Sequence, residues 1–377
     1  MKKNHNIRIV EYFEDVETTE THDGYYYSVG EAITIVILGT FCGLTNLKQI
    51  QQWAAHAKIR TVLRERFGVR DVPCYYWLTC LMKLIKPESM NAHFMEWVQD
   101  GLPKTLEDIT VSLDGKTIRS TGSMDRYKNP LHIVSAQIAE LGLTFGQEAV
   151  ESKSNEIPAV QRLIKMLHIK GCVVVADALN CQTETAEAIV AQEADYLLSA
   201  KGNQPTLMEE IENYVQDEDL RKEMETAETN ETNRGRIETR TSFVTSDIDW
   251  LYGKERWIKL SSIGAINTRF TTKDGTSDEW HYYISSKKLT AEELLKHARA
   301  EWSVETMHWL LDVHFVEDAC RVQDENIQKN LNIIRKIVLN SLKLFKVTAG
   351  SKRPLSNIML DCLIDPEFIL DILNCQN

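Results

Sequence analysis

The chain has 377 residues, of which 43% are hydrophobic and 26% are charged. That balance is typical of a soluble globular protein, and the length predicts one large α/β domain with additions or two to three domains. The formal net charge of −12 opposes nucleic-acid binding at long range, because affinity for DNA comes largely from Lys and Arg side chains that neutralise phosphates. Any contact with DNA must therefore be local.

Neither a membrane span nor a secretory signal is expected. The longest uncharged stretch begins at Ala32 and has about 15 residues, whereas a spanning helix needs roughly 20 apolar residues. The basic start of the chain reaches Glu11 before any apolar segment forms. The eight cysteines occur without a C-x-x-C pair, which is typical of reduced thiols in a cytoplasmic protein.

Apolar residues recur at helical spacing in the first part of the chain. Ala32 to Thr40 and Leu47 to Trp53 follow this pattern on either side of a break at Gly43, and Tyr75 to Ile85 forms another apolar segment. We therefore expect an α-helical module over residues 1–95, ahead of the part of the chain that carries the chemistry.

From about Ile109 the pattern changes from helical to alternating. We expect strands over residues 109–113, 131–139 and 143–150, then a helix from Val160 to Leu167 and an apolar strand from Cys172 to Ala176. An uninterrupted apolar strand is typical of a sheet covered on both faces. A helix over residues 183–192 and a strand over residues 196–199 complete the order β-β-β-α-β-α-β, which is that of a ribonuclease-H-like core in an α/β protein.

The rest of the chain divides by composition. After Pro205 it is strongly acidic and predicted to be helical to about Glu231, and strand-like segments follow. A helix carrying Glu305 comes next, and the segment beyond Gly350 is predicted to be a short helical tail. The expected layout is the helical module (1–95), the first part of the core (96–207), a β-rich insertion (208–286), the last part of the core (287–348) and the tail (349–377).

Three acidic residues lie in settings that suggest a common site. Asp114 and Asp177 each stand where an apolar strand ends, and Glu305 lies on an amphipathic helix far downstream. Mg²⁺ prefers oxygen ligands and is usually held by one or two carboxylates plus substrate phosphate. Two such ions can activate a water on one side of a phosphodiester and stabilise the leaving oxygen on the other. The three carboxylates therefore predict a Mg²⁺ or Mn²⁺ site for phosphodiester chemistry.

Each acid also has a simpler interpretation. Asp177 alone is explained as the cap of the following helix, and Asp114 alone as a turn residue. Glu305 shares one helix face with His308 and Asp312, and such a face is more often solvated or turned to a partner. Only the joint placement of the three acids on one predicted fold favours a catalytic site.

A resemblance to a known family rests on seven segments, which are SLDGKTIRS, ESKSNEIPAV, ADALNCQ, DYLLSAKGNQPTL, GRIETR, YYISS and VETMHWLLDVHFVEDACR. In this order they resemble the H-repeat-associated insertion-sequence transposases, a branch of the DDE transposases with an inserted β-rich domain. The resemblance covers most of the chain. It implies a ribonuclease-H-like core in which Asp114, Asp177 and Glu305 are the catalytic triad and hold the metal.

The resemblance also implies an activity and its partners. The expected enzyme is a bacterial DDE transposase of the cytoplasm, nucleoid-associated when bound to DNA, that cuts element ends and joins the freed 3′-hydroxyl to target DNA. The expected partners are Mg²⁺ or Mn²⁺, double-stranded DNA in the form of terminal inverted repeats and target, and a second copy in a homodimer on DNA. Two alternatives stay open: a related metal-dependent nuclease without strand transfer, and a catalytically silent DNA-binding remnant.

Some positions depart from the family pattern or have no assigned role. Glu301 stands where the resemblance suggests a basic residue or histidine, and Arg234 where it suggests histidine. An added acid beside the site would oppose the approach of DNA or change metal occupancy. The matching positions without an assigned role are Lys153, Asn155, Glu156, Lys201, Asn203 and Gln204.

Basic residues gather at two places. Arg60, Arg64, Arg66 and Arg70 have near-helical spacing in the helical module, and a second cluster comprises Arg335, Lys336, Lys343 and Lys346. A solvated helix face or a dimer surface explains either cluster equally well. We predict that Arg60, Arg64 and Arg70 contact DNA together with Lys201, and that the second cluster is the next candidate.

Overall fold

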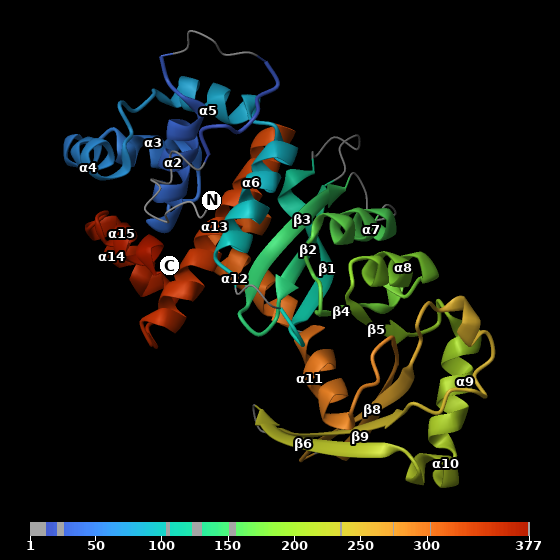
Figure 1. Ribbon diagram of the computed structural model, residues 1–377. Helices are drawn as coiled ribbons and strands as arrows, with labels where there is room; N and C mark the ends of the chain where they lie inside the picture. Colours follow the sequence, from blue (N-terminus) through green and yellow to red (C-terminus); the bar gives the residue numbers. More distant parts are fainter. Residues whose placement is uncertain are drawn as a thin grey trace.

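The computed structural model describes residues 13–20, 26–102, 106–122, 130–150, 156–233, 236–273, 275–301 and 303–375. Within these ranges nine strands form one sheet in the order β3-β2-β1-β4-β5-β9-β8-β7-β6 (Figure 1). The first five in the chain are β1 (Thr110–Ile118), β2 (Leu131–Ile138), β3 (Leu143–Val150), β4 (Val173–Ala176) and β5 (Asp195–Ala200). With α7 (Glu156–Met166) before β4 and α8 (Thr183–Ala191) after it, the predicted order β-β-β-α-β-α-β is confirmed.

The pairing of the first five strands brings two predicted acids together. β1, β2 and β3 pair antiparallel, whereas β4 lies parallel to both β1 and β5. β4 is buried along its length, because parallel strands in α/β proteins are covered on both faces. Leu113 of β1 pairs with Ala176 of β4. An aspartate follows each of these two residues, so Asp114, inside β1, and Asp177, just after β4, occupy neighbouring positions where the parallel pairing ends.

Helices from several parts of the chain cover this sheet. α6 (Pro87–Asp100), α7 and α13 (Glu325–Thr348) pack against β3, and α11 (Ala291–Glu301) packs on β1 and β4. α12 (Ser303–Phe315) also contacts β1. The helix that carries Glu305 therefore lies on the strand that carries Asp114.

Residues 208–286 extend the core sheet. β9 (Gly275–Ser285) pairs antiparallel with β5, and β8 (Ser262–Thr272), β7 (Arg236–Thr245) and β6 (Glu225–Asn233) follow outward. Two helices precede these strands in the chain, α9 (Pro205–Gln216) and α10 (Glu218–Lys222). α11 packs on β6 and β7 as well as on the core, and thereby joins the outer strands to the inner ones (Figure 1).

The prediction that the acidic segment is helical to Glu231 was wrong from Glu225 onward. Residues 225–233 form β6, which pairs with β7 over its whole length. The segment contains three threonines, whose β-branched side chains favour a strand. Glu231 lies on β6 and accepts a hydrogen bond at 3.2 Å from Arg240 of the neighbouring strand β7. Cross-strand partners therefore outweigh the acidic composition that suggested a helix.

The N-terminal helices share one hydrophobic core with the sheet. α2 (Val29–Phe41) is buried along its whole length, and α13 contacts both α2 and β3 (Figure 1). The remaining helices are α3 (Leu47–Ala54), α4 (Ala57–Phe67), α5 (Tyr75–Leu84), α14 (Leu355–Ile364) and α15 (Phe368–Asn374). Short 3-10 helices are η1 (Arg119–Thr121), η3 (Ala178–Asn180), η4 (Lys254–Arg256) and η5 (Glu317–Ala319). The predicted helical tail is confirmed by α14 and α15.

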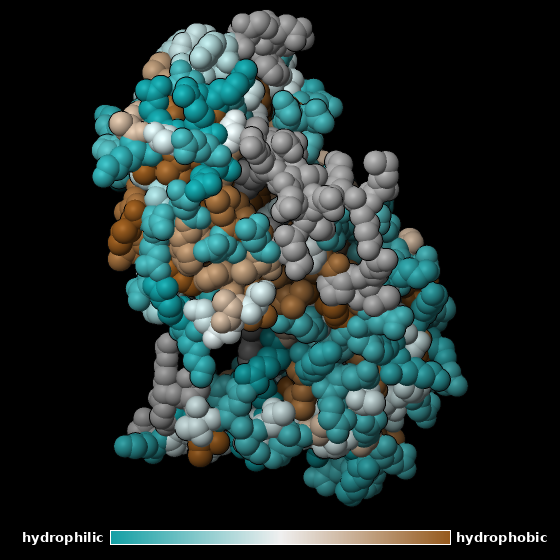
Figure 2. All heavy atoms as spheres, turned by 60° about the vertical axis from the view of Figure 1, so that its left-hand side comes forward, coloured by the Kyte–Doolittle hydropathy of each residue, from teal (hydrophilic) through white to brown (hydrophobic). Residues whose placement is uncertain are grey.

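Polar residues cover most of the face shown in Figure 2, and apolar residues gather in a band at its mid-height. Across the described ranges, no helix has both the length and the apolar character needed to cross a bilayer. All eight cysteines are free thiols, and most of them are buried in the core.

Candidate active site

Asp177 joins β4 to η3 and uses one carboxylate oxygen to cap the turn. Its Oδ1 accepts hydrogen bonds from the backbone N–H of Asn180 at 3.2 Å and from Asn180 Nδ2 at 2.9 Å. In the described part of the chain no hydrogen bond reaches Oδ2 of Asp177. Burial raises the pKa of Asp177, the Asn180 bonds lower it, and the charges of Glu156 and Asp114 raise it further, so that the net shift is upward. Asp177 therefore caps the short η3 with one oxygen, and the prediction that it caps the helix over residues 183–192 is wrong, because Gln182 occupies the N-cap position of α8.

A chain of buried hydrogen bonds supports Asp177 through Asn180. Asn180 Nδ2 also lies 3.4 Å from Glu156 Oε1, and Glu156 Oε2 lies 2.9 Å from His132 Nε2. The second ring nitrogen of His132 lies 2.9 Å from Thr117 Oγ1. Both His132 and Glu156 are buried. The position of Asp177 thus depends on side chains from β1, β2 and α7.

Gly115 makes room for the His132–Glu156 pair. A Cβ at position 115 would lie 2.7 Å from both Glu156 Oε2 and His132 Nε2. Glycine is therefore required for close approach of side chains to the strand. The turn interpretation of Asp114 is wrong, and so is the prediction that its strand ends there, because β1 continues to Ile118 and both Asp114 and Gly115 pair with β2.

Helix α12 turns part of its polar face toward β1. His308 Nε2 lies 3.2 Å from Asp114 Oδ2 and donates to it when that nitrogen carries the proton. Within the described chain His308 Nδ1 is buried without a hydrogen-bond partner. Glu305 lies in the first turn of α12, three residues before His308, and is exposed. The predicted face of α12 therefore contacts the sheet through His308 and leaves Glu305 accessible.

Lys116 anchors the other end of this face. Its Nζ donates to Asp312 Oδ1 at 2.7 Å and to Glu317 Oε2 at 3.1 Å. Glu317 is fully buried and also accepts a hydrogen bond from Asn332 Nδ2 at 2.6 Å. Burial by itself lowers the pKa of Lys116, but the Glu317 and Asp312 carboxylates outweigh it and raise the pKa above the ordinary lysine value. Lys116 is therefore charged.

Glu301 ends α11 beside the three predicted acids. Burial raises its pKa to about 7, the charges of Asp177, Asp114 and Glu305 add to the shift, and Lys201 opposes it. Four carboxylates and one lysine thus act on one region at the end of the parallel strands. Position 301 therefore places a fourth acid close to the three predicted ones.

The donors suit a hard divalent cation, because they are carboxylate oxygens. In Asp177 and in Asp114 a neighbouring side chain holds one of the two oxygens. Among the residues that the structure describes, however, no three His, Cys, Asp or Glu side chains form a group that could hold a metal ion. The donor chemistry fits a cation, and the side chains are not closed around one.

The predicted DNA-contacting arginines differ in their surroundings. Arg60 and Arg64 lie one turn apart on α4, whereas Arg70 follows the end of that helix. Arg60 pairs with Asp71 at 2.6 Å, and Arg70 Nε donates to Glu31 Oε1 at 2.8 Å. Burial raises the pKa of Glu31, but the bonds from Arg70 and from the capping serine of α2 hold it below its ordinary value. Arg70 therefore stabilises the start of α2.

Two of the four residues of the second basic cluster lie in the core, which contradicts a DNA-contacting or solvated face for them, and Lys343 and Lys346 are half-buried. Arg335 and Lys336 are buried, and Lys336 Nζ donates to Ser135 Oγ at 2.7 Å and to Gln147 Oε1 at 2.6 Å. Burial lowers the pKa of Lys336 to about 7 and that of Lys343 to about 8. These lysines satisfy polar groups of the sheet, which their composition alone did not indicate.

The remaining motif positions have mixed outcomes. Lys201 is exposed just after β5, and its charge lowers the pKa of Glu301. Gln204 Nε2 donates to the carbonyl oxygen of Cys181 at 3.1 Å, so it joins the segment after β5 to the one after β4. Three predicted positions lie outside the described residues, which are Lys153, Asn155 and Arg234.

Three residues that hydrogen-bond to acidic side chains in this region had no predicted role, which are Lys116, Asn180 and His132. Lys116 had a usable signal, because residues two apart on a strand share a face and Asp114 precedes it by two. Asn180 follows Asp177 at the spacing of a cap. His132 had no such signal, since its partner Glu156 lies on a separate element.

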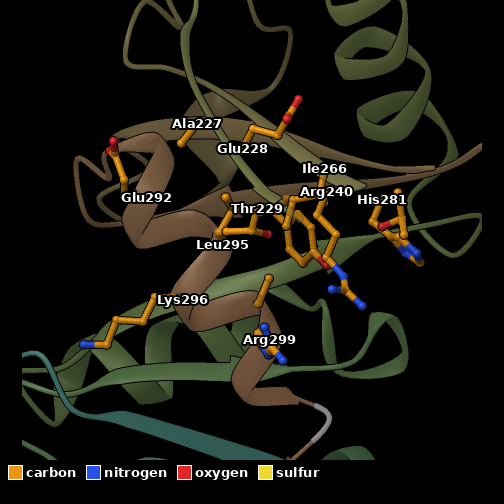
Figure 3. A pocket seen from close by; sticks show the side chains of 13 residues that line it. Ala227, Glu228, Thr229, Arg240, Ile266, His281, Glu292, Leu295, Lys296 and Arg299 are labelled. Carbon is orange, nitrogen blue, oxygen red and sulfur yellow. The ribbon is translucent and has the colours of Figure 1, made fainter. Parts of the chain in front are cut away.

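A cavity of about 280 Å³ lies between α11 and the outer strands (Figure 3). Arg240 and Arg299 line it, and both pair with Glu231. Tyr283 also lines it, and burial together with the charge of Glu301 raises the pKa of that tyrosine. The cavity therefore adjoins the acidic region, but acids neutralise its arginines.

Comparison with known proteins places these residues in a wider context. Residues 106–341 match the family described as Transposase DDE domain, and residues 10–98 match a family described as associated with that domain. The "H repeat-associated putative transposase YhhI" of Escherichia coli (strain K12) is 31% identical over 303 residues, covering 77% of this chain and 79% of that protein. The "Putative transposase YncI" of Escherichia coli O157:H7 is 29% identical over 361 residues, covering 90% of this chain and 88% of that protein.

Among solved structures, a piggyBac transposase synaptic complex with hairpin DNA superposes with a TM-score of 0.44 and 8% identity, covering 98% of this chain and 79% of that one. A likeness at that level does not establish a shared fold.

Proposed function

Because this chain belongs to the transposase DDE domain family, we propose that it cleaves DNA at the ends of an insertion sequence and joins the freed 3′-hydroxyl to target DNA. The proposed catalytic triad is Asp114, Asp177 and Glu305. The pairing of Leu113 with Ala176 is the observation that carries this assignment, because it sets two carboxylates on adjacent strands beneath the helix that bears the third. The strand and helix order supports a ribonuclease-H-like core.

Each member of the proposed triad has a defined task. Asp177 offers Oδ2 while Asn180 holds its Oδ1, and Asp114 offers Oδ1 while His308 holds its Oδ2. Glu305 is exposed in the first turn of α12 and completes the donor set. Mg²⁺ or Mn²⁺ held by these oxygens would activate a water on one side of the phosphodiester and stabilise the leaving oxygen on the other. The 3′-hydroxyl released by cleavage then attacks a target phosphodiester, so no covalent protein intermediate is needed.

We propose that residues 96–207 and 287–348 form the catalytic core, with 208–286 inserted between them and 349–377 as a tail. The helical module, residues 1–95, binds DNA in this proposal, with phosphate contacts from Arg60, Arg64 and Arg70 and a further contact from Lys201 in the core. A single triad acts on one strand at a time, so an element with two ends requires at least two copies. A homodimer on DNA is the simplest assembly that meets this need.

Amide substitutions test the triad directly. Asp114→Asn, Asp177→Asn and Glu305→Gln keep the side-chain shape and remove the charge that a cation needs. The matched control is Asp219→Asn, because that side chain is 93% exposed on α10. The substrate is a duplex taken from the inverted repeats that flank the gene, and the products are resolved as cleaved and joined strands with Mg²⁺, with chelator, and with Mn²⁺ added back.

We expect all three amide variants to fold, to bind the duplex and to lose cleavage, whereas the control cleaves as the wild type does. Chelator should stop cleavage and Mn²⁺ should restore it. Near-wild-type cleavage by any one amide variant would remove that residue from the triad. Cleaved strands without joined strands would identify a nuclease that does not transfer strands. DNA binding without cleavage under every metal condition would identify a silent remnant.

A further inference from the structure

Two side chains of β1 meet two side chains of α12. Asp114 Oδ2 lies 3.2 Å from His308 Nε2, and Lys116 Nζ lies 2.7 Å from Asp312 Oδ1. Lys116 Nζ also lies 3.5 Å from the carbonyl oxygen of His308, so the lysine reaches both turns of the helix. We call these two contacts the β1–α12 ladder.

The spacing of the ladder matches the geometry of both elements. Residues two apart on a strand share a face and are separated by about 6.6–6.8 Å. Residues four apart on a helix share a face and are separated by about 6 Å along the axis. Asp114 and Lys116 therefore face His308 and Asp312 in register. Sliding α12 by one turn along β1 would break both rungs at once.

The two rungs are similarly exposed, at 13% and 33% for Lys116 and Asp312 and at 14% and 38% for His308 and Asp114. The Lys116 rung differs in its ion pairs, because Lys116 also pairs with Glu317, whose side chain is 1% exposed. Glu317 is held in turn by Asn332 of α13 at 2.6 Å. Lys116 thus joins β1, α12 and α13 at a single point. Ion pairs withdrawn from water contribute little net stability, and their best-attested role is to select one arrangement of the elements that they join.

We propose that Lys116 is a positioning residue that sets the placement of Glu305 relative to Asp114 by fixing α12 on β1. This inference rests on the proposed function, since it assigns Lys116 a role in assembling the proposed metal site. Glu305 lies in the turn of α12 that precedes His308, so its placement along β1 follows from the register of the ladder. Lys116 itself touches neither substrate nor metal in this role.

A purely structural role makes a different prediction from a positioning role. If Lys116 only stabilises the fold, its replacement lowers the unfolding temperature and leaves the metal affinity of the folded protein unchanged. If it positions Glu305, the folded protein binds metal more weakly because one of its three carboxylates is displaced. Changes in the residues that orient metal ligands typically cost about 10–100-fold in metal affinity.

The test uses the full chain and four variants. Lys116→Met removes the charge and keeps the length, Lys116→Arg keeps the charge, and Asp312→Asn weakens the same rung from the helix. Lys329→Met is the matched control, because Lys329 is 21% exposed and pairs with Glu325 within α13. Mn²⁺ binding is measured by calorimetry and by electron paramagnetic resonance, thermal unfolding is followed on the same samples, and cleavage is followed as Mn²⁺ is increased.

We expect Lys116→Met to weaken Mn²⁺ binding about tenfold, with the Mn²⁺ concentration for half-maximal cleavage rising in parallel. Lys116→Arg should recover most of the loss, Asp312→Asn should show a smaller loss, and the control should match the wild type. Wild-type Mn²⁺ affinity in folded Lys116→Met overturns the inference and leaves the proposed function intact.

If Lys116→Met does not fold, Asp312→Asn decides, because its side chain is 33% exposed and its amide keeps the shape. Unchanged Mn²⁺ affinity in that variant overturns the inference. If the wild type itself neither binds Mn²⁺ nor cleaves DNA, the proposed function fails and the positioning role fails with it.

Discussion

Replacing Gly115 by Ala should disturb Asp177 without touching it. The added Cβ would lie 2.7 Å from Glu156 Oε2 and 2.7 Å from His132 Nε2, below the 3.0 Å that real Cβ contacts essentially never breach. Neither neighbour has room to retreat, since His132 is 2% exposed and Glu156 is 4% exposed. The pair must therefore shift, and Asn180, which bonds to both Glu156 and Asp177, passes the shift to the proposed catalytic acid.

The size of the effect follows from the packing around position 115. Forcing one extra methyl group into a filled interior costs about 1–3 kcal/mol of unfolding free energy. We expect the upper part of that range, because the atoms that must move are hydrogen-bonded polar groups, and a buried polar group left without its partner costs about 1–3 kcal/mol by itself. The displacement of Asp177 should also slow DNA cleavage, in proportion to how far its free oxygen moves.

Urea unfolding of matched alanine variants measures this cost. Gly202→Ala is the control, because an added Cβ there meets nothing within 4 Å. Adding Glu156→Ala to Gly115→Ala removes one of the two clashing groups, so the double variant should lose less stability than the sum of the two single losses. A Gly115→Ala protein within about 0.5 kcal/mol of the wild type, or strict additivity in the double variant, would refute the steric reasoning.

Four further substitutions have expected outcomes that the structure sets. Burial raises the pKa of Glu301 from 4.5 to about 7, so the folded state loses stability relative to the unfolded state as pH rises between these values. Without divalent metal, Glu301→Gln should therefore be more stable than the wild type at pH 8 and equally stable near pH 4. Equal stability of the two proteins at pH 8 contradicts this expectation. Burial lowers the pKa of Lys336 from 10.5 to about 7, so the unfolded chain takes up this proton before the folded protein does as pH falls through that window. The wild type should therefore lose stability relative to Lys336→Met between pH 10 and pH 7. A constant difference in unfolding free energy between the two proteins argues against burial of the neutral amine. Arg70→Gln should lower the unfolding free energy by about 1 kcal/mol, because Glu31 is buried against it. Arg64→Gln should reduce the slope of log affinity for DNA against log salt by about one unit, and an unchanged slope removes Arg64 from the DNA interface.

Much of the core could be predicted because its signals are local. The valines of β4 form a continuous apolar run, and a run of that length between turns is typical of a strand covered on both faces. Asp177 comes directly after that run, and Asp114 lies in a strand whose alternation is visible in the sequence. Knowledge of the element order then sufficed to bring both acids to one part of the sheet.

The rest could not be predicted because it depends on partners far apart in the chain. β6 was mistaken for helix, since its stability comes from pairing with β7 and from ion pairs such as Arg240 with Glu231. The sequence predicts a surface position for Lys336, because lysine is almost never fully buried unless it is paired. Its acceptors, Ser135 and Gln147, lie about 200 residues earlier in the chain, at 201 and 189 positions' separation, and no local pattern connects them.

The charges of the molecule bear on the order in which its ligands bind. Neighbouring carboxylates raise the pKa values of Asp177 and Glu301, and the same negative charges repel a DNA phosphate. A divalent cation bound among these carboxylates would attract the phosphate that they otherwise repel. Metal and DNA should therefore each strengthen the binding of the other at the core. Arg64 and its neighbours on the helical module lie outside this coupling, since their attraction to phosphate needs no metal. If the helical module binds DNA as proposed, it should hold DNA first, and the proposed site should engage the scissile phosphate only when a cation has neutralised the carboxylates.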